Sequence, residues 1–484
     1  MAPHANADVE TSLAECTLST TDQKARHRSL PVGNSSLSFW HKTARAFEHL
    51  NANCDQSIPE NAKYCIIGSG LAGCLTAWKL VESGVPGHEI LILEAREAVS
   101  GASGRNAGHV RPDAFRGFTA YARIHGEEQA KKIIENEKLV FETLSDFVAK
   151  HNVPCDFHST TTFDVCLTDE FAAYEAESLE KYRSAGGDVS HVKAYHGVEA
   201  KERTKVASAR SAYEWPAGSS HPAKLAQWLL NRSIAKGVQL WTHCPVTRVV
   251  EHPDHAQSQS RWDVKTPRGG VAAETVIHCT NAYASYLLPE LETFITPNRA
   301  QAHSIVPSKS LSGANTIKST MSLRYSLRHF YSLIQRQSDG TIIFGISRSN
   351  PGFSKETEAG LVTFDDTTYH PEVADVSIRE FQHIFPDAPK TQRRHGEGGD
   401  HYWTGIIGMT PDSVPLVGPV TGKEGQWICA GFNGHGMARI FTCAPGLVKL
   451  IHGESWSSTG LPECFQYSSE RLARVAEEQI KGVW

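Results

Sequence analysis

The fold class follows from residues 64–73, which read YCIIGSGLAG. Tyr64 to Ile67 is a short apolar run that ends in glycines, as is typical of a buried parallel strand. Apolar residues recur at helical spacing over residues 71–83, and residues 90–93 (ILIL) form a second apolar run. The sequence therefore predicts a strand, a helix and a second, parallel strand, the repeating unit of an α/β fold.

The turn between the first strand and the helix has the pattern G-x-G-x-x-G, at Gly68, Gly70 and Gly73. In this pattern the first glycine permits a tight turn, the second lets a pyrophosphate approach the backbone, and the third lets helix and strand pack closely. Glu94 follows the second strand, about 20 residues on, where an acidic side chain accepts hydrogen bonds from a ribose hydroxyl. The alternative is a glycine turn with a structural role only. Because both strands, the helix and the acid occur in order, we expect a dinucleotide site.

Two further glycine-rich segments favour a flavin over a nicotinamide cofactor. The first is GASGRNAGH at residues 101–109, close behind the first strand pair. A second loop of small residues there suits a large, extended cofactor whose tricyclic ring rests against backbone. The second segment is GFNGHG at residues 431–436, before a helix that we expect to begin near Met437. The positive end of that helix would stabilise negative charge on the pyrimidine edge of a flavin.

The ordered set of segments resembles the D-amino-acid oxidase (DAO) superfamily of FAD-dependent oxidoreductases, and within it sarcosine oxidase-like and gamma-glutamylputrescine oxidase-like members of fungal type. The resemblance extends over residues 60–455. It implies a mixed α/β (α+β) architecture, in which a discontinuous, Rossmann-like FAD-binding domain joins a substrate domain with an antiparallel sheet. The implied division is a flexible leader at 1–30, an FAD-binding domain at 31–120, 205–290 and 395–484, and a substrate domain at 121–204 and 291–394.

The resemblance also implies which residues hold FAD. They belong to the glycine turn, the end of the second strand, the loop at 101–109, two separate positions further on, and the C-terminal glycine loop. The expected FAD-binding residues are Gly68, Gly70, Leu71, Ala72, Gly73, Glu94, Ala95, Arg96, Ser103, Gly104, Arg105, Asn106, Ala107, Gly108, His109, Val246, Asn281, Gly431, Asn433, Gly434, His435, Gly436 and Met437.

Two departures from the family pattern bear on the chemistry. Sarcosine-oxidase-like enzymes have a carboxylate-binding lysine two residues after the G-H-G motif, where this chain has Ala438. They also attach the flavin to a cysteine just before the segment that resembles residues 409–412, and residues 405–408 (GIIG) contain none. We therefore expect FAD to be held non-covalently, and a simple α-amino acid is not the expected substrate. Arg439 is a candidate replacement for the lysine, and a position on the helix surface is the alternative for it.

Three side chains are the catalytic candidates. Arg111 follows the flavin loop, where we expect contact with cofactor or substrate; a structural salt bridge is the alternative. The strands at 330–335 and 341–346, joined by a Ser-Asp-Gly turn, have hairpin chemistry. Alternation places His329 and Tyr331 on one face of the first of them, where one could line the substrate pocket. For each of these two, a non-catalytic role is the alternative.

Composition narrows the remaining classes. The 484-residue chain has a formal net charge of −5, so no global basic field attracts nucleic acid. Its 11 cysteines include no C-x-x-C pair and its 24 histidines no H-E-x-x-H motif, so no metal site is expected. The first sixty residues hold no long apolar run, so we expect no secretory signal and no membrane anchor. By elimination the predicted location is the cytoplasm.

Hydride transfer from an amine to a flavin needs alignment more than a strong side-chain base. The sequence therefore predicts an oxidoreductase that converts an amine or amino-acid-like C–N bond of a small molecule to an imine, with electrons passing to molecular oxygen. One alternative is a flavin-dependent dehydrogenation or oxidative cyclisation in fungal specialised-metabolite biosynthesis. The others are a cofactor-binding protein without turnover and an NAD-dependent dehydrogenase.

Overall fold

The computed structural model describes residues 28–253, 260–346, 350–386 and 394–483. Within them the strands form two sheets, and the predicted strand–helix–strand unit lies in the first. It consists of β1 (Asn61–Ile67), α3 (Leu71–Glu82) and β2 (Ile90–Leu93), and the two strands pair in parallel. The predicted α/β fold class is confirmed.

The first sheet has eight strands, in the order β16-β17-β10-β1-β2-β7, with β9 and β8 continuing from β10. The pairs from β17 to β7 are parallel. β2 is buried along its whole length, because helices and loops cover both faces of a parallel sheet. The other strands are β7 (Gln239–Trp241), β8 (Arg248–Glu251), β9 (Trp262–Thr266), β10 (Gly269–His278), β16 (Leu416–Pro419) and β17 (Gln426–Ala430).

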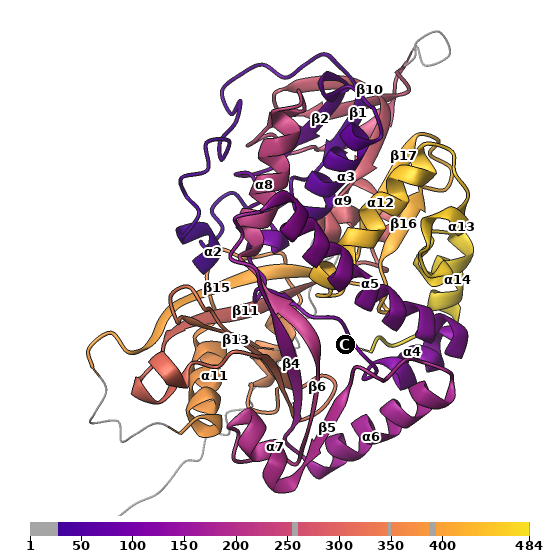
Figure 1. Cartoon of the computed structure of the whole chain (residues 1–484). Coiled ribbons are helices and arrows are strands. Elements are labelled where there is room, and N and C mark those ends of the chain that lie inside the picture. Colours follow the sequence, from indigo (N-terminus) through magenta and orange to yellow (C-terminus); the bar gives the residue numbers. More distant parts are fainter. Residues whose placement is uncertain (1–27, 254–259, 347–349, 387–393, 484) are drawn as a thin grey trace, which may run out of the picture.

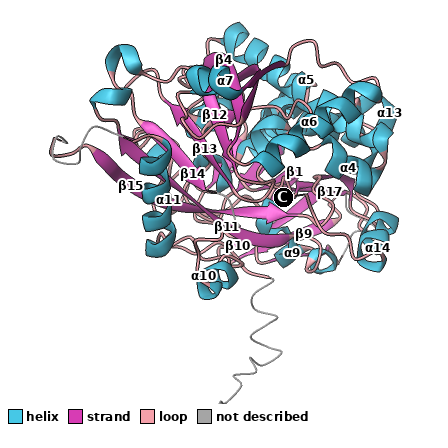
Figure 2. Cartoon of the chain, turned by 90° about the horizontal axis from the view of Figure 1, so that it is seen from below, coloured by secondary structure: helices cyan, strands magenta, loops and turns pink. Residues whose placement is uncertain are grey.

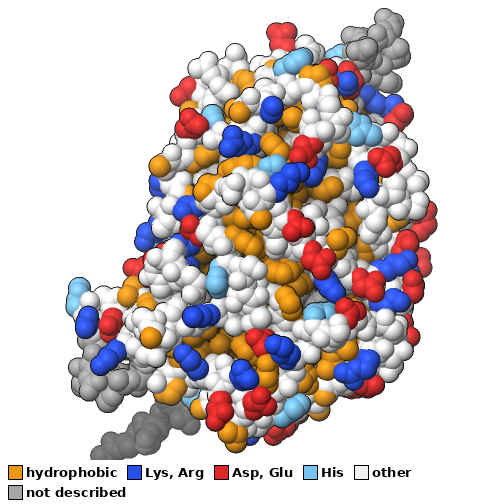
Figure 3. Space-filling view, viewed as in Figure 1, with side chains coloured by type: hydrophobic (Ala, Val, Ile, Leu, Met, Phe, Trp, Pro, Cys, Tyr) orange, Lys and Arg blue, Asp and Glu red, His pale blue; other side chains and the backbone are white. Residues whose placement is uncertain are grey.

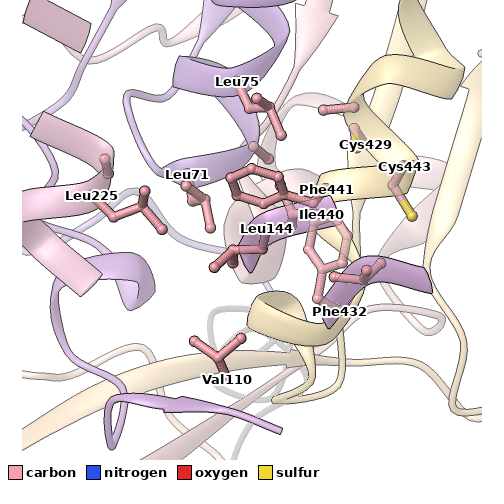
Figure 4. Packing of buried hydrophobic residues seen from close by; sticks show 14 of the residues in the cluster. Leu71, Leu75, Val110, Leu144, Leu225, Cys429, Phe432, Ile440, Phe441 and Cys443 are labelled. Carbon is pink, nitrogen blue, oxygen red and sulfur yellow. The ribbon is translucent and has the colours of Figure 1, made fainter. Parts of the chain in front are cut away.

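The main apolar core fixes the position of α3 and of the glycine turn before it. α3 packs against α8 and α12, and α12 also packs against α5 (Figure 1). Leu71, Leu144 and Phe441 are among the buried side chains that meet there (Figure 4). Burying one such side chain contributes about 1.5–3 kcal/mol. The three partner helices are α5 (Glu127–His151), α8 (Pro222–Ile234) and α12 (Ile440–Ile451).

The second sheet has nine strands, in the order β15-β11-β14-β13-β12-β4-β6-β3, with β5 on β6. All of these pairs are antiparallel except β12 with β4. β13 and β14 form the predicted hairpin. Strands run through the middle of the molecule and helices cover much of the outside (Figure 2). The strands are β3 (His109–Val110), β4 (His158–Cys166), β5 (Lys193–His196), β6 (Ser211–Ser219), β11 (Thr296–Val306), β12 (Thr320–Arg324), β13 (Phe330–Gln335), β14 (Ile342–Ile346) and β15 (Gly398–Met409).

Strand pairing cuts across the division of the chain expected from the sequence. β6 and β15 pair within the second sheet, whereas the division expected from the sequence places residues 205–290 and 395–484 in the FAD-binding domain. These strands pair with segments far away in the chain, and local periodicity carries no information on such partners. The domain division itself stays a prediction, and strand membership favours boundaries that follow Ser219 and Met409.

Short helices complete the described part of the chain, and charged side chains of both signs are interspersed over the face shown in Figure 3. No helix in the described ranges combines the length and the apolar character that crossing a membrane requires. The remaining α-helices are α2 (Phe39–Lys42), α4 (Phe118–His125), α6 (Asp169–Ser184), α7 (Gly197–Thr204), α9 (Ala284–Leu287), α10 (Lys355–Gly360), α11 (Pro371–Ile384), α13 (Trp456–Thr459) and α14 (Ser469–Glu477).

Candidate functional site

A cavity of about 540 Å³ lies between the two sheets. One wall is made by the glycine turn after β1, by Glu94 after β2 and by the segment after β10. The opposite wall comes from β11, β13, β14 and β15, and the loop before α12 closes one end. In open α/β sheets, ligands bind outside the carboxyl ends of the strands, as they would here. Its size is within the range of small-molecule and cofactor sites.

The three glycines of the turn have different steric surroundings. Gly68 has a φ of +103°, and a β-carbon there would lie 2.9 Å from the carbonyl oxygen of Cys279. A β-carbon at Gly73 would collide with the carbonyl oxygen of Gly68, so α3 needs glycine to approach β1. At Gly70, on the cavity wall, the nearest atom to an added β-carbon is Oγ of Ser103, at 3.2 Å. The turn fits a pyrophosphate at the N-terminus of α3.

The Glu94 carboxylate is held in one orientation at the cavity wall. It accepts hydrogen bonds from the backbone N–H and the hydroxyl of Ser69, at 2.9 and 2.7 Å, and from the backbone N–H of Arg96 at 3.0 Å. A carboxylate has about four acceptor positions, so capacity remains for a further donor. Its place fits the ribose hydroxyl of a dinucleotide.

The loop at 101–109 is fastened to both sheets. Oγ of Ser103 accepts a hydrogen bond from the backbone N–H of Leu71 at 2.8 Å, which ties the loop to the start of α3. The buried Arg105 donates to the carbonyl oxygens of Ser100 at 2.7 Å and Thr404 at 2.9 Å. Burial lowers the pKa of Arg105 to about 10, so it remains a cation at neutral pH. Its guanidinium therefore links the loop at 101–109 to Thr404 of β15.

Asp366 is a site residue that the sequence did not reveal. Its buried carboxylate receives Arg96 at 3.0 Å and lies 3.6 Å from Arg105. Both arginines line the cavity. Asp366, which lies in the loop between α10 and α11, orients them through its carboxylate. No local pattern marks Asp366, because its partners lie far away in the chain.

Two asparagines fix the loop at 431–436. Oδ1 of Asn281, just after β10, accepts hydrogen bonds from the backbone N–H groups of Gly431 and Phe432, at 3.0 and 3.1 Å. Oδ1 of Asn433 accepts from the backbone N–H of Thr410 at 2.8 Å. Both asparagines have positive φ, a conformation that asparagine adopts more easily than most residues. The loop is thereby tied to the ends of β10 and β15.

Most of the expected FAD-binding residues line one continuous cavity. Five do not, and these support it from behind: Gly73, Gly104, Gly108, His109 and Gly431. The expected residues on the wall are Gly68, Gly70, Leu71, Ala72, Glu94, Ala95, Arg96, Ser103, Arg105, Asn106, Ala107, Val246, Asn281, Asn433, Gly434, His435, Gly436 and Met437.

Three of these five residues, Gly104, Gly108 and His109, belong to the loop at 101–109. A β-carbon at Gly104 would collide with the ring of His41, and one at Gly108 would meet Trp40 at 2.8 Å. Burial lowers the pKa of His109 to about 3, and neither of its ring nitrogens has a hydrogen-bond partner among the described residues. His109 is therefore an uncharged side chain beside the cavity.

Arg111, a catalytic candidate, is not on the cavity wall. Its Nη2 lies 2.7 Å from Oδ1 of the fully buried Asp164, and its Nε donates to the Thr162 hydroxyl at 2.9 Å. Asp164 also receives Arg116 at 2.9 Å and Arg324 at 3.0 Å. Burial opposes the charge of Asp164, but the three arginines outweigh it and lower its pKa. The structure therefore favours the alternative, a structural salt bridge.

His329 lies just before β13, with its ring centroid 5.8 Å from that of Tyr331, as alternation indicates, but neither residue lines the cavity. Phe330 and Ser332 line it instead. Tyr331 is 1% exposed, and its hydroxyl oxygen accepts a hydrogen bond from Nδ2 of Asn350 at 2.7 Å. The expectation that His329 or Tyr331 lines the pocket is therefore corrected: the residues that line it are one position further along the chain. Alternation shows which residues share a face of a strand, but not which face meets a ligand.

Arg439 is not available to a substrate. It is 0% exposed, and its Nε donates to Oε1 of Glu137 at 3.0 Å. Its two terminal nitrogens donate to the carbonyl oxygen of Ser413 at 2.9 Å and to the Tyr121 hydroxyl at 2.7 Å. Ala438 is also buried and off the wall. Arg439 is therefore neither an anchor for a substrate carboxylate nor a residue of the helix surface, because side chains of α4 and α5 enclose it.

The wall opposite the glycine turn is largely apolar and was not predicted. It includes Ala302, Leu327, Phe330, Ile346 and Ile406, brought together by pairing in the second sheet. Arg328 is an exposed charged residue on the same wall. Nowhere in the described ranges do three or more His, Cys, Asp or Glu side chains group as metal ligands would.

Comparisons with known proteins agree with this geometry. The family model described as "DAO: FAD dependent oxidoreductase" matches residues 63–450. The probable oxidoreductase OrdL of Haemophilus influenzae is 22% identical over 437 residues, which cover 85% of this chain and 88% of the relative. The gamma-glutamylputrescine oxidoreductase of Escherichia coli is 22% identical over 398 residues, which cover 81% of this chain and 84% of the relative.

Solved structures share the fold. The L-proline dehydrogenase from P. horikoshii superposes with a TM-score of 0.65 at 21% identity, covering 87% of this chain and 99% of the other. The glycine oxidase from Geobacillus kaustophilus gives a TM-score of 0.64 at 18% identity, covering 82% of this chain and 96% of the other.

Proposed function

Since the chain belongs to the DAO family of FAD-dependent oxidoreductases, we propose that it oxidises a C–N bond of a small amine or amino-acid-like substrate to an imine, with molecular oxygen as the electron acceptor. The observation that carries this proposal is the cavity of about 540 Å³, which joins the dinucleotide cradle to an apolar wall of the second sheet. The amine class follows from relatives whose names state amine or amino-acid substrates.

Different segments of the chain would hold different parts of the cofactor. Gly70 and the start of α3 would hold the pyrophosphate, and Glu94 a ribose hydroxyl. The loops at 103–107 and 434–437 would hold the flavin ring. Bound FAD would supply the acceptor for the hydride that leaves the substrate carbon, and the means of passing its two electrons to oxygen. The substrate nitrogen loses a proton, and water hydrolyses the imine to a carbonyl compound and an amine.

The apolar wall excludes water and orients the substrate. Phe330 and Ile346 present hydrophobic surface to the cavity, and such a wall aligns a small molecule largely by shape. A desolvated site also favours a neutral nitrogen over an ammonium group, because burial of an isolated charge is costly. The nitrogen must be neutral for its lone pair to assist departure of the hydride.

We also propose that FAD is held without a covalent bond. Cys279 is the cysteine on the cavity wall in the described residues, and it lies at the glycine turn. Burial raises the pKa of the Cys279 thiol to about 12, so a reactive thiolate is absent at neutral pH. Acid precipitation of the purified protein should leave the flavin in the supernatant; a yellow pellet would contradict this.

A second candidate function is a flavin-dependent dehydrogenation or oxidative cyclisation in specialised metabolism. Ala438 stands where related enzymes place a carboxylate-binding lysine, and Arg439 is enclosed with Glu137. Neither Ala438 nor Arg439, the positions in question just after the loop at 431–436, therefore offers a free cation to an amino-acid carboxylate.

One experiment separates the two functions. The holoenzyme is mixed anaerobically with amines, amino acids and hydroxy compounds, and loss of the oxidised flavin absorbance is followed. Bleaching by amines or amino acids alone supports C–N oxidation, whereas bleaching only by compounds without a C–N bond overturns it. Hydrogen peroxide formed in proportion to substrate in air would support oxygen as the acceptor.

A further inference from the structure

A histidine on the cavity wall is backed by a buried carboxylate. Nδ1 of His435 lies 3.4 Å from Oε1 of Glu137, which comes from the middle of α5 and is fully buried. Oε1 also accepts the hydrogen bond from Nε of Arg439, and Oε2 accepts one from the backbone N–H of Asp113 at 2.8 Å. Glu137 is therefore fixed from three directions, and it faces the imidazole.

This arrangement sets the orientation of the ring. A carboxylate beside Nδ1 favours the tautomer with the proton on that nitrogen, as in other carboxylate–imidazole pairs. Nε2 then carries the lone pair, on the opposite side of the ring from Glu137. The His435 side chain is 20% exposed and lines the cavity. The imidazole of His435 is thus a basic group of the cavity wall.

The charges around His435 come from several elements. Glu137 of α5 is the negative group facing the ring, and Arg439 lies beyond its carboxylate. Arg116, before α4, also acts on His435, but Asp113 at 3.1 Å and Asp164 at 2.9 Å neutralise it. On β3, which also packs near this loop, His109 is uncharged.

This surrounding suits a group that accepts a proton and returns it. Burial lowers the pKa of His435 below its ordinary value, while Glu137 acts in the opposite direction. The charge that forms on protonation of the ring meets a carboxylate already in place. No reorganisation of the buried pair is needed.

We propose that His435 and Glu137 form a proton-accepting pair for the substrate, in which Nε2 of His435 takes the proton from a substrate ammonium group and Glu137 is the positioning residue. The N–H bond breaks and its electron pair stays on nitrogen as the lone pair that C–N oxidation requires. The proton moves to Nε2 and leaves to solvent after turnover. This role rests on the proposed function, and it extends the substrate class to amines that bind as ammonium ions.

The first test is the pH dependence of anaerobic flavin reduction by the best amine of the screen, in wild type and His435→Asn. Asparagine retains a donor toward Glu137 but has no basic nitrogen. At pH 7 the variant should be reduced about 100-fold more slowly. Its rate should recover to near wild type once the pH exceeds the pKa of the free amine, and added imidazole should rescue it at pH 7.

The second test has a readout other than turnover. Cumylamine has no hydrogen on the carbon attached to nitrogen, so it cannot be oxidised there. Its binding is measured in weakly buffered solution at pH 7 with an indicator dye. Wild type should retain the ammonium proton, whereas His435→Asn should release about one proton per bound ligand. The FAD dissociation constant of the variant is measured alongside, and both tests use protein saturated with FAD, which separates proton transfer from damage to the cofactor cradle.

Glu137→Gln tests the positioning residue. Loss of the negative charge should lower the pKa of His435 further, so the acid limb of the reduction rate should move to lower pH. If this variant does not fold, His435→Asn alone decides the matter. His88→Asn, at an exposed histidine far from the wall, is the matched control and should behave as wild type.

The outcomes separate the two proposals. If no amine reduces the wild-type flavin, the proposed function fails and the proton-accepting role fails with it. If amines reduce wild type and His435→Asn has the same pH profile and the same proton release, only the pair is overturned.

Discussion

Gly73, in the first turn of α3, lies directly against the carbonyl oxygen of Gly68 at the end of β1. No β-carbon fits between the helix and the strand at this point. The contact explains in steric terms why the third glycine of the motif is needed although it does not touch the cavity.

Gly73→Ala should therefore destabilise the fold and weaken FAD binding together. Moving backbone to admit one methyl group costs about 1–3 kcal/mol. The free energy of unfolding of the apoprotein in urea is the measurement. Gly360→Ala is the control, because an added β-carbon meets nothing within 4 Å there and alanine favours a helix. Equal stability of the Gly73 variant and wild type would contradict the steric role.

Glu94→Gln should weaken FAD binding specifically. The carboxylate accepts three hydrogen bonds from the chain and is placed to accept another from a ribose hydroxyl. A hydrogen bond to a charged group is worth about 1.5–3 kcal/mol, so the FAD dissociation constant should rise about 10- to 100-fold.

Flavin fluorescence during titration of the apoprotein measures the change. Glu89→Gln is the matched control, since Glu89 is a partly buried glutamate off the cavity wall that pairs with Lys63 at 3.1 Å. Its dissociation constant should stay within about twofold of wild type. Equal weakening by both variants would argue against a ribose contact at Glu94.

The part of the site that sequence predicted best is the part encoded locally. The turn at Gly68, Gly70 and Gly73 and the acid at Glu94 follow from short-range geometry: a strand, a tight turn, a helix and a second strand. The positive φ of Gly68 and the close contact of Gly73 with the Gly68 carbonyl oxygen both arise within one supersecondary unit. Such local demands are readable in a single sequence.

The part that sequence placed wrongly depends on partners distant in the chain. Arg111 was a catalytic candidate, but Asp164 of β4 occupies its guanidinium. Alternation correctly put His329 and Tyr331 on one face, yet the choice of face depends on how the second sheet packs. Asp366, which orients Arg96 and Arg105, carries no local signal at all.

Acid should weaken the fold through the ion pair that encloses Glu137. Burial would raise the pKa of Glu137, but His435 and Arg439 outweigh it and hold the pKa below its ordinary value. A carboxyl with a lowered pKa in the fold stabilises it above its ordinary pKa of about 4.5, and this contribution is lost as the pH falls below that value.

Urea unfolding of apoprotein between pH 7 and pH 3 measures this dependence. Glu137→Gln should be less stable at pH 7, because Arg439 loses its partner, and its stability should fall less steeply below pH 4.5. Glu135→Gln, at an exposed position of the same helix, should follow wild type throughout. Parallel pH curves for wild type and Glu137→Gln would refute the assignment.

The last prediction concerns Arg328, at the exposed edge of the cavity. One of its terminal nitrogens donates to the carbonyl oxygen of Gly482 at 2.7 Å, and within the described ranges it forms no ion pair with a carboxylate. The other cationic side chains on the wall, Arg96 and Arg105, are engaged by Asp366. Arg328 is therefore the cation best placed to meet an acidic group on a substrate.

Arg328→Gln should raise the KM for amines that carry a carboxylate about tenfold, with kcat little changed, because the lost interaction is present in ground and transition states alike. KM for the corresponding amides should stay the same. Arg328→Lys should retain part of the preference, and added salt should weaken it in wild type, since the group is exposed. Arg203→Gln, an arginine on the surface of α7, is the control. Equal changes for carboxylates and amides would show that Arg328 supports the wall and does not select acidic substrates.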